Sequence, residues 1–205
     1  MTIPHILVLV SALVSIAGAS AYIRDTLAGR TKPNRVSWSM WALAPLIGTA
    51  AALSAHADIW ATTRIFLSGF LPLLVFSASF LNKQSFWKLT TFDLLCGVCS
   101  VLALIVWGVV DSPRLAILLA ALGDGFAALP TIVKAWKYPE TETGLTYVAS
   151  FVSVVLIIPS IPKWDIANSA FQIYLLIANT LLLIAVYRKR ILFWRRAAST
   201  IIHHS

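Results

Sequence analysis

Seven apolar stretches divide this chain, and each is close to the roughly 20 residues that a helix needs to cross a membrane. Hydrophobic residues make up 59% of the chain, charged residues make up 12%, and the mean hydropathy is +0.84. A soluble domain carries about twice that share of charge. The sequence therefore predicts an all-α integral membrane protein with seven transmembrane helices. The predicted spans are Ile3–Ile23, Val36–Ala55, Ile59–Leu81, Leu89–Val110, Leu115–Trp136, Leu145–Ile161 and Ile166–Tyr187.

The basic residues are distributed unevenly between the two sides that seven crossings define. Those on the side of the C-terminus are Arg24, Arg30, Lys32, Arg35, Lys83, Lys88, Lys134, Lys137, Arg188, Lys189, Arg190, Arg195 and Arg196. Arg114 and Lys163 fall on the other side, and Arg64 lies within a span. Because Lys and Arg accumulate on the cytoplasmic side, we expect a multi-pass protein of a bacterial inner membrane with its N-terminus outside and its C-terminus in the cytoplasm. The net charge of +8 then reflects topology and contact with the lipid bilayer, and no nucleic-acid partner is expected.

An internal repeat adds to this picture. The run from Ala21 to Trp38 resembles the later run from Pro130 to Tyr147, and each joins two apolar stretches through a short polar turn. Such a duplication in a membrane protein usually indicates two structural halves with a site between them. Because one helix between the halves reverses the chain direction, the two three-helix repeats are predicted to be parallel. The predicted divisions are 1–81 (first three-helix repeat), 82–113 (linker helix), 114–190 (second three-helix repeat) and 191–205 (basic cytoplasmic tail).

The second run carries a motif pattern, with Pro130–Thr131 in one helix, Lys137 in the turn, Thr141–Glu142 after it and Thr146 opening the next helix. This pattern resembles the PQ-loop proteins and, among them, the sugar-transporting SWEET and SemiSWEET group. The first run matches at fewer positions, namely Arg30, Lys32 and Ser37. The resemblance implies a 3+1+3 fold in which two three-helix units rock about a central solute site.

The family also places a proline near the start of the second helix of each repeat, at positions that are not proline in this chain. Pro45 lies further along the second span, and Pro130 and Thr131 lie in the fifth. These three are the candidate hinge or gate residues. The family places an asparagine of a third helix at its sugar site, and the resemblance makes Asn179 the candidate in the seventh span.

The residue that most clearly suggests chemistry is Asp124, near the middle of the fifth span between Gly123 and Gly125. A carboxylate at this depth costs several kcal/mol unless it faces water, protein or a partner. The glycines leave room for another helix or a solute. Asp124 is interpreted either as a group that couples protons or binds a solute hydroxyl, or as a structural aspartate held by Ser or Tyr hydroxyls. Arg64 is a possible counter-charge, although snorkelling to the outer interface is favoured.

Other candidate solute-binding residues are polar or aromatic side chains within the predicted spans. They are Ser15, Trp38, Trp41, Gln172 and Asn179. Ser15 occupies the repeat position of Asp124, and a buried carboxamide such as Asn179 needs hydrogen-bond partners. Trp38 and Trp41 lie one turn apart, where both could stack on a sugar ring or a nucleobase. For Trp38 a place in the interfacial aromatic belt is the favoured interpretation, and Trp41 stays open.

These features favour a transporter or facilitator of a small neutral polar solute, with a sugar as the first candidate. A nucleoside or vitamin-like solute is the alternative, because transporters of the nicotinamide riboside type resemble the same seven-helix plan. A receptor or sorting protein remains the rival class, as the KDEL receptors resemble SWEETs. No histidine lies near the middle of a span to serve as a base, so an enzyme is not expected. Cys96 and Cys99 are interpreted as packing residues, and no metal or other cofactor is expected. The oligomeric state stays open, with a homo-oligomer possible.

Overall fold

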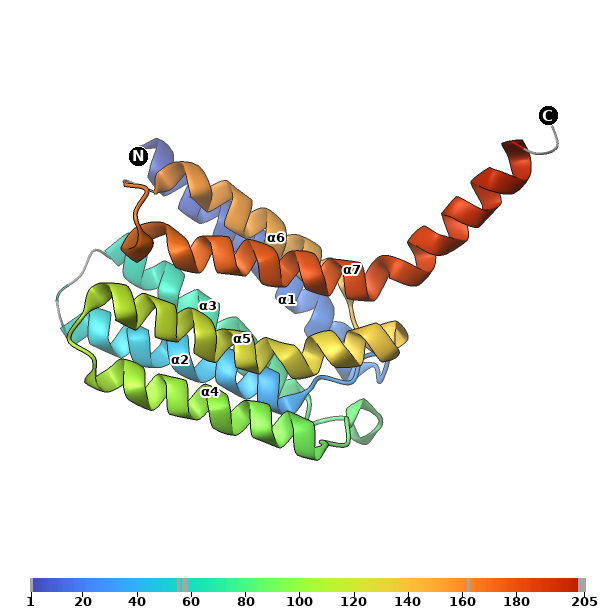
Figure 1. Cartoon of the computed structure of the whole chain (residues 1–205), viewed down its shortest axis with the longest axis horizontal. Coiled ribbons are helices and arrows are strands. Elements are labelled where there is room, and N and C mark those ends of the chain that lie inside the picture. Colours follow the sequence, from blue (N-terminus) through green and yellow to red (C-terminus); the bar gives the residue numbers. More distant parts are fainter. Residues whose placement is uncertain (1, 55, 57–58, 162, 203–205) are drawn as a thin grey trace.

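The computed structural model describes residues 2–54, 56, 59–161 and 163–202 and consists of helices joined by short connections. The helices are α1 (Ile3–Leu27), α2 (Arg35–Ser54), α3 (Ile59–Ala78), α4 (Thr91–Val109), α5 (Pro113–Lys137), α6 (Gly144–Ile157) and α7 (Ile166–Ile202). Short 3-10 turns lie at η1 (Lys83–Ser85), η2 (Pro139–Thr141) and η3 (Ile158–Ser160). No strand is present in the described ranges. Each predicted span coincides with one helix, with ends that agree within a few residues except at the end of α7, which confirms the all-α prediction (Figure 1).

The helices are apolar enough for a membrane protein. Those that meet the length and hydropathy of a membrane span are α1, α2, α4, α5 and α7. Two shorter apolar segments, Thr62–Ala78 and Gly144–Ser160, correspond to α3 and to α6 with η3. On α4, large apolar side chains such as Leu95, Ile105 and Val109 are exposed along its length. A surface of this kind is suited to contact with lipid rather than water.

The seventh helix continues without a break to Ile202, beyond the predicted span end at Tyr187. Its final turns extend away from the other helices (Figure 1). The predicted basic tail, 191–205, is thus helical as far as Ile202, and residues 203–205 lie outside the described part of the chain. The side chains of Arg195 and Arg196, which contribute to the basic count, also lie outside the described part.

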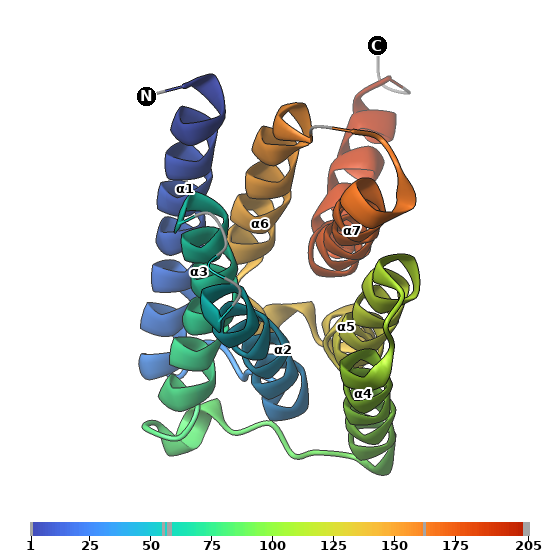
Figure 2. The ribbon, with the colours of Figure 1, turned by 90° about the vertical axis from the view of Figure 1, so that its left-hand side faces the viewer.

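Helix packing follows a regular pattern (Figure 2). In the first half of the chain, α3 packs against both α1 and α2, and in the second half α7 packs against both α5 and α6. The two groups meet where α1 packs against α6 and where α2 packs against α5. The fourth helix packs mainly against α5 and also contacts α2.

Small residues permit the close approach of these helices. A Cβ atom added to Gly18 of α1 would lie 2.5 Å from the Cβ of Ala149 in α6, so only glycine fits at this crossing. A Cβ added to Gly69 of α3 would lie 2.9 Å from the carbonyl oxygen of Ala42 in α2. Packing of this kind is typical of helix interfaces in membranes, where no hydrophobic effect drives one helix against another.

The bundle has two distinct ends. The odd-numbered helices α1, α3, α5 and α7 begin at one end, here called the N-terminal end. The α1–α2, α3–α4 and α5–α6 connections lie at the other end, here called the basic end because most of the Lys and Arg residues gather there. At the basic end α4 starts with a capping box, in which the Thr90 backbone N–H donates to Asp93 Oδ2 over 2.7 Å. The Asn34 amide also donates to Asp93 Oδ1 over 3.0 Å, so this aspartate is held by local structure.

Candidate functional site

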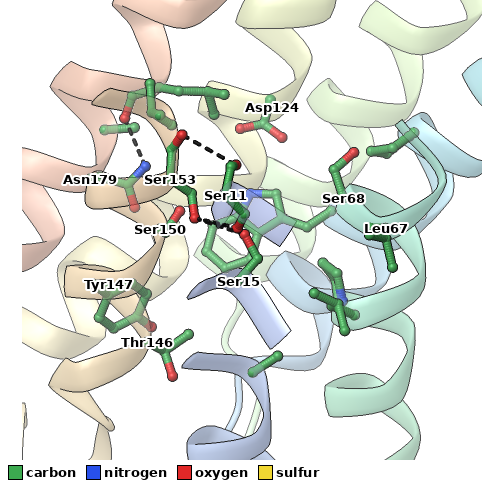
Figure 3. Close-up of a pocket in the computed structure, with 18 of the residues that line it drawn as sticks. Ser11, Ser15, Leu67, Ser68, Asp124, Thr146, Tyr147, Ser150, Ser153 and Asn179 are labelled. Carbon is green, nitrogen blue, oxygen red and sulfur yellow. Dashed lines mark hydrogen bonds between the residues drawn. The ribbon is translucent and has the colours of Figure 1, made fainter. Parts of the chain in front are cut away.

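A cavity of about 260 Å³ lies inside the bundle, lined by side chains from α1, α2, α3, α5, α6 and α7. Figure 3 shows its polar side chains gathered from helices of both halves of the chain. Trp38 and Tyr147, near the starts of α2 and α6, line it toward the basic end, and Arg64 and Phe171 line it toward the N-terminal end. Of the predicted solute-binding residues, Ser15, Trp38, Trp41, Asp124 and Asn179 lie on its wall.

A serine cluster joins α1 to α6 on one wall (Figure 3). The Ser153 hydroxyl donates to the Ser11 carbonyl over 3.0 Å, and the hydroxyls of Ser15 and Ser153 lie 2.8 Å apart. Because Ser153 uses its one proton on the carbonyl, Ser15 must donate to Ser153. The Ser15 oxygen keeps its acceptor lone pairs, which can receive a hydrogen bond from a solute hydroxyl.

Asp124 lies on the cavity wall and is held by Tyr174, one of the polar residues of the seventh span, as the interpretation of an aspartate held by a Tyr hydroxyl expects. The Tyr174 hydroxyl of α7 donates to Asp124 Oδ2 over 2.6 Å, and this is the hydrogen-bond partner that the described residues give it. The neighbouring glycines have separate packing roles. Gly123 lets α4 approach, since an added Cβ would lie 3.2 Å from the Ala103 Cβ of α4, and Gly125 faces the Tyr174 ring. Asp124 therefore keeps its second carboxylate oxygen for a proton or a solute.

Arg64 lines the cavity toward the N-terminal end. Its guanidinium donates to the Gln172 side-chain oxygen over 3.2 Å, which connects α3 to α7. Gln172, predicted to bind solute, thus acts on the cavity through Arg64. The Arg64 head group is thus engaged by Gln172 at this end of the bundle, and its place at the outer interface stays a prediction.

The two tryptophans differ in their surroundings. Trp38 is only 4% exposed, and its ring lies 4.7 Å from the Tyr22 ring, which contradicts the favoured aromatic-belt interpretation. Its ring centroid lies 5.2 Å from that of Trp41 at an interplanar angle of 83°, a favourable edge-to-face arrangement. Trp38 closes the cavity toward the basic end, and Trp41 is the half-buried ring that a solute could contact.

Asn179 satisfies part of its hydrogen-bonding capacity within its own helix. Its side-chain nitrogen donates to the Leu175 carbonyl over 2.8 Å. The prediction that this carboxamide needs external partners therefore applies to its oxygen atom. That oxygen is an acceptor available to a hydroxyl in the cavity (Figure 3).

The candidate hinge residues fall in two places. Pro45 lines the cavity within α2, where its carbonyl accepts a hydrogen bond of 2.8 Å from Thr49. Pro130 and Thr131 are buried between the cavity and the basic end. The Thr131 hydroxyl donates to Ser37 Oγ over 2.7 Å across the α5–α2 contact. The hinge role of all three stays a prediction.

Comparisons with models of protein families, with curated proteins and with solved structures give no match. The geometry of the site therefore carries the functional argument. Within the described ranges, no group of three or more His, Cys, Asp or Glu side chains could hold a metal ion.

Proposed function

We propose that this protein transports a small neutral polar solute, with a sugar first, by alternating access between two three-helix units. The observation that carries the proposal is the cavity between the two halves, with a carboxylate, serine hydroxyls and a tryptophan ring on its walls. Hydroxyl groups of a polyol can donate to Asp124 and Ser15, and the ring of Trp41 can cover an apolar sugar face. The aromatic side chains of Trp38 and Tyr147 line this cavity toward the basic end of the bundle.

The packing pattern supports the proposed parallel repeat of the 3+1+3 type. Exchanging α1 with α5, α2 with α6 and α3 with α7 turns each contact within one unit into a contact within the other. The same exchange turns the α1–α6 contact into the α5–α2 contact. The fourth helix has no counterpart under this exchange, as expected of a linker. A PQ-loop or SWEET-type relationship is part of this proposal and rests on the motif pattern.

The size of the cavity bears on the solute. Its volume of about 260 Å³ lies just below the range of roughly 300–1,000 Å³ that is common for drug-sized ligands. A monosaccharide fits this space more readily than a nucleoside. The nucleoside or vitamin-like alternative keeps one specific support, the exposed part of Trp41. The second ring that stacking between two tryptophans would need belongs to the buried Trp38.

Flux measurements with purified protein in liposomes test the proposal. We expect uptake of at least one labelled monosaccharide and no uptake in protein-free liposomes. If the protein binds a solute in a thermal-shift measurement but moves none of the monosaccharides or nucleosides, the receptor alternative takes its place. A ligand at 100 times its dissociation constant would stabilise the fold by about 2.7 kcal/mol.

Asp124→Asn separates the two roles of this carboxylate. If Asp124 binds a solute hydroxyl, exchange and uptake should both weaken by about 1–3 kcal/mol, which is roughly a 5- to 140-fold loss of apparent affinity. If it couples protons, uptake driven by a pH gradient should stop while exchange continues. Asp111→Asn, at an exposed position in the α4–α5 connection, is the matched control and should change neither rate. Unchanged transport in Asp124→Ala would contradict both roles.

A further inference from the structure

A buried ionic cluster lies at the basic end of the bundle, beside the cavity. Glu142, between η2 and α6, accepts hydrogen bonds from Tyr22 over 2.8 Å and from Tyr147 over 2.6 Å, both at Oε2. Its Oε1 atom lies 2.5 Å from the Lys134 ammonium. Lys134 is 2% exposed and Glu142 is 8% exposed, so the pair is shielded from water. Tyr22, Lys134, Glu142 and Tyr147 are called the latch below.

The latch joins the two halves of the chain. Tyr22 belongs to α1, and the other members belong to α5, α6 and the connection between them. Lys134 also donates to the Lys32 carbonyl in the α1–α2 connection. The two connections are held together further by the hydrogen bond of 3.0 Å from the Lys32 backbone N–H to the Thr141 carbonyl. A solute that leaves the cavity through the basic end must therefore separate these contacts.

The chemistry of the latch suits a closure that opens and reforms. A buried ion pair adds little net stability, because the cost of removing both charges from water offsets most of their attraction. When the two halves part, the carboxylate, the ammonium and the phenol hydroxyls regain water. An apolar seam at the same place would expose apolar surface instead. Opening the latch therefore costs less free energy than parting an apolar seam of the same size would.

The latch also contacts the cavity directly. Tyr147 belongs to the latch and lines the cavity, and Tyr22 packs against the cavity-lining Trp38 with ring centroids 4.7 Å apart. A solute that moves Trp38 or Tyr147 therefore disturbs hydrogen bonds to Glu142. Only a ligand with different affinities for the open and closed states can shift that equilibrium, and these rings provide the contact that differs.

We propose that Tyr22, Lys134, Glu142 and Tyr147 form the gate at the basic end, and that this gate opens as the two units rock. A solute in the cavity acts on the gate through the rings of Trp38 and Tyr147. The proposal rests on the proposed transport function. It adds the residues that close one end of the pathway.

A disulfide across the same interface tests the gate. The hydroxyls of Ser37 and Thr131 lie 2.7 Å apart between α2 and α5, and both residues are fully buried. In a protein with Cys96→Ala and Cys99→Ala, the pair Ser37→Cys with Thr131→Cys is oxidised with copper phenanthroline, which removes two electrons and two protons from the thiols. We expect the locked protein to lose at least nine-tenths of its solute flux and to recover it on reduction.

The matched control is Thr26→Cys with Thr31→Cys in the same background. These hydroxyls lie 3.1 Å apart at the same end, but both belong to the first half of the chain. Its disulfide should leave flux unchanged. If the oxidised Ser37–Thr131 pair transports at the rate of its reduced form, the basic end does not open and the gate proposal is overturned.

A second readout keeps the gate separate from the transport proposal. Ala12→Cys places a thiol on the cavity wall. Its labelling by a membrane-impermeant maleimide is measured in vesicles in which the basic end of the protein faces the reagent. Glu142→Gln should raise the labelling rate at least fivefold, and the Ser37–Thr131 disulfide should abolish the rise. If Glu142→Gln raises the labelling rate in this way but no solute is transported, the transport proposal is rejected and the gate proposal is kept. An unchanged rate in Glu142→Gln would reject the gate, whatever the flux.

Discussion

The two ends of the bundle are closed by different chemistry. At the basic end, Glu142 holds Lys134 and two tyrosine hydroxyls in a buried cluster. At the N-terminal end, Arg64 of α3 reaches Gln172 of α7 through a hydrogen bond of 3.2 Å between half-buried side chains. The contacts at the basic end are shorter and more deeply buried, and one of them joins two opposite charges, whereas the Arg64–Gln172 contact joins a charge to a neutral amide. The comparison indicates a molecule sealed firmly at one end and lightly at the other.

This difference gives a direction to the proposed transport cycle. If the basic end faces the cytoplasm, as the Lys and Arg distribution predicts, the described conformation is closed to the cytoplasm. A solute would then enter past Arg64 and reach Asp124 before the latch opens. The lightly closed end is the natural entrance, because fewer strong contacts have to separate there.

The largest expected effect comes from breaking the latch. Glu142→Gln leaves the Lys134 ammonium buried without its counter-charge, which should lower the free energy of unfolding by about 3–5 kcal/mol. Adding Lys134→Met should restore most of that loss, since the double variant buries no unpaired charge and the introduced glutamine still accepts hydrogen bonds from the tyrosines. Thermal unfolding in detergent measures both variants. A double variant as unstable as the single one would show that the ion pair is not the source of the effect.

A middle-sized effect should come from the α1–α6 contact that lies between the latch and the cavity. Gly18→Ala places a methyl group against Ala149, and the overpacking should cost about 1–3 kcal/mol of unfolding free energy. Gly108→Ala is the matched control, because nothing lies within 4 Å of an added Cβ there. The control should be neutral or slightly stabilising, as alanine favours a helix more than glycine. Equal losses in the two variants would mean that α1 and α6 do not pack this closely.

The smallest effect is expected at the N-terminal end. Gln172→Ala removes the partner of Arg64, whose guanidinium can turn to water, so the unfolding free energy should fall by less than about 1 kcal/mol. Uptake from that end should keep its apparent affinity or improve slightly, because the light closure is removed. Chemical unfolding and initial uptake rates measure the two quantities. A loss as large as that of Glu142→Gln would break the comparison between the ends.

The sequence by itself determined the helices and several residues of the cavity. Apolar length fixes where a chain can cross a membrane, so the seven helices could be predicted from hydropathy alone. Depth along a span is also readable, which is why Asp124, Ser15 and Asn179 could be named as candidates near the middle of the bundle. A carboxylate at that depth has to face protein or water, whatever its neighbours are.

Only the tertiary structure decided which side chains meet. Tyr174 holds Asp124 because α7 packs against α5, and Trp38 is buried rather than interfacial because Tyr22 of α1 covers its ring. In the sequence, Glu142 is part of the motif pattern and Lys134 is one of the basic residues that predict topology. Only helix packing brings the two side chains together. Hydropathy reports how deep a residue lies, but not the direction in which its side chain points around the helix. That direction, and with it the partners at the site and the latch, is set by contacts between helices distant in the sequence.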